Sequence, residues 1–370
     1  MTRMKERQSN LELLRILCAL FVLAFHLISQ SDALGDLNTQ NFTFSVFFHA
    51  GGRMACNVFV MIGAYFLTQK HVSFKQIFRL EFKTIAACLF VNFLMLLFQK
   101  DYYSQVAYTT KDIIFQFLPI LGKPYWFIQD YIFLLLLSPL LNALLNCESI
   151  KKYLDFTIKL FLFFVVLFSF PPFFDNSIFT SDLLWFCFVY VVIGRISQNN
   201  FEFFRHKNRC LILAIAIYVL MCLATLFFDK IKADYLYAWE IRFFYISMYQ
   251  NIFCFLCALF LFYYFVNVRI KSNRIINVLG RHTLGVYIVH QIPILYSNGQ
   301  GWIWKDAFKV NAYFNTNLFP LYSVLVTLLV FLICVVVDYL LDFVVNIMVG
   351  SYPITHLIDK AQQCLQKPNE

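Results

Sequence analysis

The sequence predicts an all-α fold: a polytopic membrane bundle of about ten transmembrane helices with no soluble domain. Of the 370 residues, 61% are hydrophobic and only 14% are charged, and the mean hydropathy is +0.67. A soluble domain has roughly 45–50% apolar and about 25% charged residues. This chain has too much apolar surface to hide from water, which excludes a soluble enzyme, a disulfide scaffold and a disordered chain.

Ten apolar runs are long enough to be considered as membrane spans, since a crossing needs about 20 mostly apolar residues. They are expected at 11–29, 45–67, 77–98, 125–145, 153–170, 182–198, 209–228, 242–267, 281–297 and 318–338. No long polar segment separates them. We therefore expect one transmembrane domain over residues 1–350 and a short cytoplasmic tail over residues 351–370.

The basic residues predict the orientation of these spans. Alternate connections carry fourteen Lys and Arg residues on one side and seven on the other. Because cytoplasmic loops are enriched in Lys and Arg, both termini are expected in the cytoplasm, and residues 171–181 and 298–312 are expected to face outward. All five tryptophans fall at outer helix ends or in outer loops, where an aromatic belt would lie (Trp126, Trp185, Trp239, Trp302, Trp304). A multi-pass protein of the plasma membrane is the expected outcome.

The first span carries a cation and a titratable base on one face. Arg15 and His26 are eleven residues apart, which is close to three helical turns and about 16 Å along the axis. Intramembrane ionisable residues are functional candidates because each costs free energy. Two interpretations remain open at this stage. Arg15 could extend to the interface while His26 bonds a neighbouring helix, or the two could hold an anionic cofactor and a reacting group at opposite ends of a path.

Other intramembrane charges favour a structural interpretation. Asp338 and Asp342 lie one turn apart near the cytoplasmic end of the last span, where basic loops would meet them. Long side chains near helix ends can reach the interface, and this is expected for four further residues (Glu81, Lys83, Arg195, Arg242). No metal-ligand spacing is present, so no metal ion is expected.

Five motifs occur in a fixed order along the chain. They are Asn10-Leu-Glu-Leu-Leu-Arg15-Ile with His26; Asn57-Val-Phe-Val-Met-Ile-Gly-Ala-Tyr65-Phe-Leu; Phe74-Lys-Gln-Ile-Phe-Arg79-Leu; Tyr125-Trp126-Phe-Ile with Leu137-Ser-Pro139-Leu-Leu; and Leu279-Gly-Arg-His-Thr-Leu-Gly285-Val-Tyr287-Ile-Val-His290. This ordered set resembles the acyltransferase-3 family of integral membrane proteins. Two departures are visible, because Gly63-Ala64 replaces the usual Ser-Gly and the third motif lacks a nearby proline.

The resemblance implies a reaction and a set of partners. Members of this family move an acyl group, usually acetyl from cytoplasmic acetyl-CoA, to a hydroxyl of a surface polysaccharide or a lipid-linked sugar. Besides the bilayer, the implied partners are therefore acyl-CoA and a glycan acceptor, and no nucleic acid. Many members carry a fused extracytoplasmic hydrolase-like domain. Here either the membrane part reaches the acceptor alone or a separate extracytoplasmic transferase completes the transfer.

The resemblance also implies roles for particular residues. Arg15 and His26 correspond to the family's catalytic positions, and Arg79 corresponds to a basic position that binds the donor. His26 could accept a hydroxyl proton at neutral pH or carry the acyl group transiently, and the guanidinium groups could hold CoA phosphates.

Three further residues are substrate-binding candidates on weaker grounds. Tyr287 and His290 share one surface of the ninth span, although His290 could equally be a packing residue. Trp126 could stack on a sugar or belong to the aromatic belt. The rival hypothesis from another class is a transporter or flippase for a lipid-linked oligosaccharide, which would explain ten helices but not the ordered motifs.

Overall fold

The computed structural model describes most of the chain as helix. The described residues are 8–31, 40–68, 74–106, 125–169, 181–231, 248–296 and 301–350, with a few single positions at 111–118 and at 356. Within these ranges every regular element is helical and no strand occurs. The predicted all-α class is therefore confirmed. Residues 242–247 of the predicted 242–267 span and most of the expected tail lie outside the described residues.

Each predicted span corresponds to helix in the described residues. The main helices are α1 (Ser9–Gln30), α2 (Phe42–Leu67), α3 (Phe74–Phe98), α6 (Trp126–Asn146), α7 (Lys151–Phe168), α8 (Asp182–Asn199), α9 (Lys207–Ile231), α11 (Ile252–Asn267), α12 (Arg274–Arg281), α13 (Thr283–His290), α14 (Pro293–Tyr296) and α15 (Phe319–Gly350). Six of them, α1, α2, α3, α6, α9 and α15, are long and apolar enough to cross a membrane. The remaining predicted spans are helical but shorter or less apolar.

The ninth predicted span is not one helix, and this expectation was wrong. The chain breaks at His282, between α12 and α13, and again after His290, before α14. Pro293 explains the second break, because proline has no N–H to donate and disfavours helical geometry in the residue before it. Non-helical backbone at membrane depth is tolerated where protein surrounds it, and α13 is packed against α1, α3 and α15.

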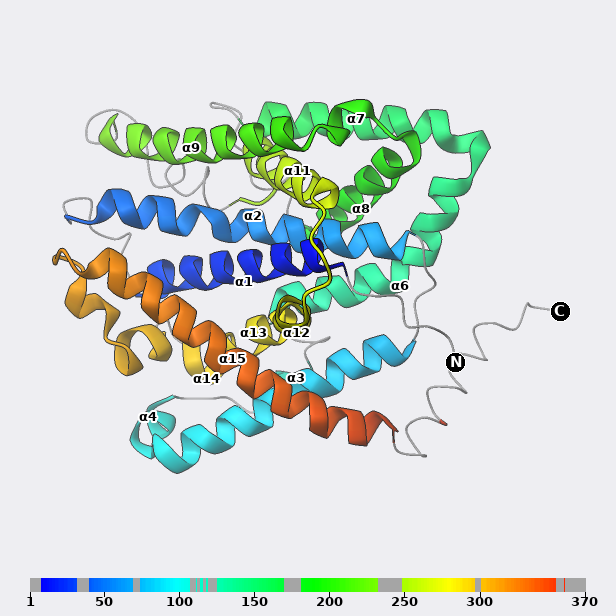
Figure 1. The fold of residues 1–370 in the computed structure, drawn as a ribbon. Helices are drawn as coiled ribbons and strands as arrows, with labels where there is room; N and C mark the ends of the chain where they lie inside the picture. Colours follow the sequence, from blue (N-terminus) through cyan, green and yellow to red (C-terminus); the bar gives the residue numbers. More distant parts are fainter. Residues whose placement is uncertain are drawn as a thin grey trace.

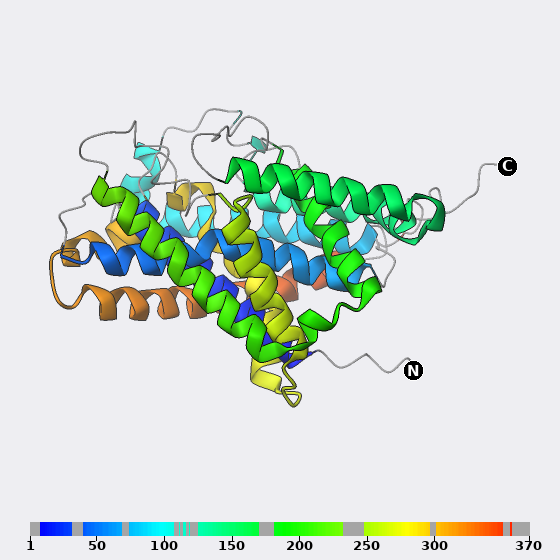
Figure 2. The same cartoon turned by 90° about the horizontal axis from the view of Figure 1, so that it is seen from above.

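Helix α1 lies at the centre of the bundle (Figures 1 and 2) and packs against α2, α11, α12, α13 and α15. Two glycines bring α1 and α2 together. A Cβ on Gly51 would lie 2.4 Å from the Phe21 ring, and one on Gly52 would lie 2.1 Å from the Cβ of Phe25. Small residues permit close backbone approach between membrane helices. This close contact fixes the position, relative to α2, of the α1 face that carries His26.

The outer surfaces of α3, α9 and α15 expose apolar side chains, such as Leu97, Leu223 and Leu332. Such surfaces are suited to lipid contact.

The aromatic-belt interpretation fails for two tryptophans. Trp185 and Trp304 are 1% and 0% exposed and donate their indole N–H groups to Asn57 Oδ1 at 2.8 Å and Gln30 Oε1 at 2.9 Å. Burial with a hydrogen-bond partner makes them core residues.

Candidate active site

His26 and His290 form a hydrogen-bonded pair in the core of the bundle. The Nδ1 atom of His26 lies 2.8 Å from Nε2 of His290, and the ring centres are 5.0 Å apart. The amide of Gln291 lies 3.1 Å from the same His26 nitrogen. His290 is 1% exposed, whereas His26 is half-buried. The first and last sequence motifs thus meet at one point.

The contacts of His290 fix the hydrogen-bonding role of each ring nitrogen. His290 Nδ1 lies 2.6 Å from the carbonyl oxygen of Val286, which can only accept, so Nδ1 of His290 carries the proton. Neutral His290 then accepts at Nε2, and His26 donates from Nδ1. In this tautomer the Gln291 amide faces the same nitrogen with its oxygen, since the two ends of an amide are interchangeable by a flip. This arrangement leaves Nε2 of His26 unprotonated, so that it can act as a base or nucleophile.

Arg15 lies at the other end of the same α1 face. Its guanidinium donates to Glu12 Oε1 at 2.9 Å and sits 5.9 Å from the centre of the Phe66 ring of α2. The Arg15 side chain is 25% exposed. Glu12 in turn lies against Gly280, where an added Cβ would come within 2.5 Å of Glu12 Oε2. Arg15 is therefore a partly exposed cation that Glu12 holds at one end of the α1 face.

A small apolar cavity of about 20 Å³ lies between these two ends. Ala19 and Val22 line it from α1, and both fall on the Arg15–His26 face because the four residues follow helical spacing. Residues of α2, α6 and α13 complete the lining (Cys56, Phe59, Phe127, Thr283, Leu284, Val286, Tyr287, His290). The cavity thus reaches His290 of the histidine pair.

Arg79 belongs to a second polar cluster, where α3, α12 and α15 meet. Its guanidinium lies 3.3 Å from Asp342 Oδ1, and the guanidinium of Arg281 lies 3.4 Å from Asp342 Oδ2. The two arginine side chains are 37% and 46% exposed. Each therefore contacts the carboxylate through one nitrogen and keeps further N–H donors for another partner.

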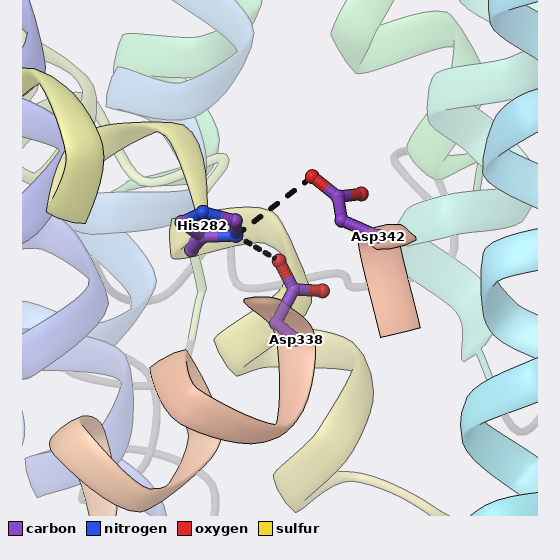
Figure 3. A group of neighbouring side chains, drawn as sticks. All are labelled: His282, Asp338 and Asp342. Carbon is purple, nitrogen blue, oxygen red and sulfur yellow. Dashed lines mark hydrogen bonds and ion pairs between the residues drawn. The ribbon is translucent and has the colours of Figure 1, made fainter. Parts of the chain in front are cut away.

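Beneath these arginines lies a buried ion-pair network. Nζ of Lys83 lies 2.7 Å from Asp338 and 3.1 Å from Asp342. Nδ1 of His282 lies 2.6 Å from Asp338, and Figure 3 shows His282 beside the two carboxylates. The Lys83 side chain is 11% exposed, so the expectation that it reaches the interface was wrong. Asp338 and Asp342 meet helix residues rather than loops. A neighbouring carboxylate offers Lys83 a better partner than water at the interface.

The His282, Asp338 and Asp342 side chains are of the kinds that hold metal ions, with ligand atoms within 4.8 Å of one another. Lys83, however, contacts both carboxylates and supplies the positive charge that a metal would bring. We therefore interpret the group as an ion-pair network.

The expected interfacial role of Arg195 was also wrong, because it is 7% exposed and donates twice to Asp155 at 2.8 Å. Arg242 lies outside the described residues.

The two aromatic candidates occupy different places. Tyr287 lines the cavity and packs edge-to-face on Phe127, with ring centres 5.6 Å apart, one turn before His290. Trp126 lies at the start of α6, stacked at 5.6 Å on Tyr249, and is not among the residues that line the cavity. Asp182 accepts a hydrogen bond from the Tyr249 hydroxyl. Tyr287 thus joins the histidine site, and Trp126 lies apart from it.

Two polar residues of α2 escape the sequence analysis. His49 is 2% exposed, and its ring stacks on Phe25 with centres 4.2 Å apart. The guanidinium of Arg53 lies 5.1 Å from the centre of the same Phe25 ring. Phe25 is next to His26 in the chain and packs edge-to-face on it at 5.2 Å. The available signal was a charge within an apolar span, the same signal that identifies Arg15.

Comparison with known proteins gives one result. A family model described as an acyltransferase domain matches residues 8–339, which include every site residue discussed above except Asp342. Neither the comparison with curated proteins nor the comparison with solved structures gives a match.

Proposed function

Since the chain belongs to the acyltransferase-3 family of membrane acyltransferases, we propose that it moves an acetyl group from cytoplasmic acetyl-CoA to a sugar hydroxyl. The proposed acceptor is a cell-surface polysaccharide or a lipid-linked sugar, and the proposed location is the plasma membrane with both termini in the cytoplasm. The family membership supports acyl transfer in general. The choice of acetyl donor and glycan acceptor follows from the resemblance of the motifs.

One observation carries this proposal. The face of α1 that holds Arg15 and His26 lines an apolar cavity, and this cavity ends at His290. CoA has an anionic end and a thioester end joined by a long arm. A cation at one end of this α1 face and a base at the other match this division of charge, and the apolar side chains between them would keep water from a bound thioester.

His26 is the proposed base. Its unprotonated Nε2 accepts the proton of the acceptor hydroxyl as the oxygen attacks the thioester carbonyl carbon. The C–S bond then breaks, and the imidazolium returns the proton to the departing CoA sulfur. His290 holds the tautomer by accepting from His26 Nδ1. A transient acyl group on His26 Nε2 is compatible with the same geometry.

Three arginines are proposed to bind the phosphates of CoA. Arg15 and Arg79 were expected in this role, and Arg281 joins them because it shares Asp342 with Arg79. Partly exposed guanidinium groups with free N–H donors suit bidentate phosphate binding. Trp126 is proposed to stack on the acceptor sugar.

The experiment that tests this function uses membranes with and without the protein, supplied with acetyl-CoA carrying a labelled acetyl group. We expect release of free CoA and label in the surface glycan only when the protein is present. Mild alkali should release the label as acetate, because the product is an ester. Membranes that release no CoA and gain no ester would contradict the proposal.

A further inference from the structure

Arg53 is an intramembrane cation that the proposed function leaves unused. It lies in the middle of α2, a 26-residue helix, and is half-buried. Among the described residues it makes no ion pair and no hydrogen bond, and its Nε atom is buried without a partner. Asp182 lies within electrostatic reach, and its Oδ1 accepts from the Tyr249 hydroxyl, but it makes no direct ion pair with Arg53.

Folding does not account for an unpaired guanidinium at this place. Ionisable groups inside a membrane protein are costly unless they are paired. Three other buried or half-buried cations of the described bundle have carboxylate partners: Lys83 has Asp338, Arg195 has Asp155 and Arg15 has Glu12. Arg53 departs from this pattern. An unpaired charge that persists despite its cost points to a ligand that is negatively charged during function.

The position of Arg53 identifies which negative charge this is. Its Cζ lies 5.1 Å from the Phe25 ring centre and the His26 ring lies 5.2 Å from that centre, so the two groups are at most about 10 Å apart. A single acyl carbonyl is therefore within reach of both the base and the cation. One turn beyond Arg53 on α2, Cys56 lines the apolar cavity. Arg53 thus lies beside the end of the cavity where His26 acts.

A second buried polar atom, Nδ1 of His49, also lies beside the Phe25 ring. His49 precedes Arg53 by one turn of α2 and stacks on Phe25. The residue is 2% exposed, and its Nδ1 has no hydrogen-bond partner. A buried polar atom without a partner costs free energy, and a bound polar group would remove that cost. Two such atoms on one face of α2, both beside Phe25, indicate a polar ligand at this point.

We propose that Arg53 is a catalytic residue that stabilises the oxyanion of the tetrahedral intermediate. The role rests on the proposed function. When the acceptor oxygen bonds to the thioester carbonyl carbon and its proton passes to His26 Nε2, the carbonyl electron pair moves to oxygen. Arg53 stabilises this negative oxygen. Its electron pair then re-forms the C=O bond as the C–S bond breaks, and the departing CoA sulfur takes the proton from His26. A preorganised cation in a dry site acts strongly because it needs no reorganisation.

The test compares Arg53→Gln with Arg195→Gln, a matched arginine that has a carboxylate partner. Labelled acetyl transfer is measured in membranes that contain the native acceptor, and the melting temperature is measured on purified protein. For Arg53→Gln we expect kcat to fall by about 100- to 1,000-fold with the donor KM unchanged. The melting temperature should stay at or above the wild-type value, since an unpaired charge is removed. Arg53→Lys should retain part of the activity.

For Arg195→Gln we expect the opposite: a lower melting temperature with near-normal kcat for the protein that remains folded. Arg53→Gln with a wild-type rate would overturn the proposal, as would a loss of melting temperature equal to that of Arg195→Gln. Failure of the wild type to release CoA would instead refute the proposed function. The role of Arg53 would then fall with it.

Discussion

His290 accepts a hydrogen bond from His26 across 2.8 Å, although 264 residues separate them in the chain. The Val286 carbonyl holds the other nitrogen of His290, so the chain of bonds runs from backbone to His290 to His26. A base oriented by a second group, which is itself oriented, is the common arrangement for proton transfer in enzymes. His290 is therefore a positioning residue, and His26 is the group that reacts.

The two histidines should respond differently to the same substitution. Asn keeps hydrogen-bonding capacity but does not titrate, so His26→Asn should insert and accumulate normally and yet add no detectable acyl ester to the glycan. His290→Asn should retain partial activity, with kcat lowered by about 10- to 100-fold, because His26 loses its fixed tautomer. The measurement is ester content per amount of membrane-inserted protein. Equal ester content in His26→Asn and wild type would exclude His26 as base and as acyl carrier.

The sequence was sufficient to place Arg15 and His26 on one face, because the helical period alone determines that. It was not sufficient to find His290 as the partner of His26, since the contact depends on how α13 packs against α1. The break before α14 had a visible signal in Pro293, but the break at His282 had none. The Lys83 network likewise could not be predicted, because its members come from three separated helices and their burial depends on packing.

Arg15 should affect donor binding rather than the chemical step. Arg15→Lys keeps the charge but loses the planar group that binds phosphate through two nitrogens, so the donor KM should rise with kcat little changed. Titration of acetyl-CoA against initial rate measures this. Arg274→Lys, at the exposed start of α12, serves as the control and should leave the KM unchanged. A wild-type KM in Arg15→Lys would restrict Arg15 to its pair with Glu12.

The buried network of Lys83 should be important for stability. Lys83→Met would leave Asp338 and Asp342 buried without their shared cation, and breaking a buried ion pair costs about 3–5 kcal/mol. A clear fall in melting temperature is expected, and adding Asp338→Asn should recover part of it by removing an unpaired charge. The matched control is Lys151→Met, which loses only a pair with the exposed Glu148 and should change stability little. Similar melting temperatures for Lys83→Met and Lys151→Met would contradict the network's role.

The topology can be tested at two described positions that the charge distribution places on opposite sides. Asn199 ends α8 on the side expected to be cytoplasmic, and Asn311 lies in the loop 298–312, which is expected to face outward; both are exposed. Each is replaced by Cys in a background where the accessible native cysteines are removed. A membrane-impermeant maleimide added to intact cells should label Asn311→Cys, and Asn199→Cys should react only after the membrane is opened. The reverse pattern would invert the bundle, placing Arg15 and Arg79 outside, away from cytoplasmic CoA, and would therefore also contradict the proposed donor.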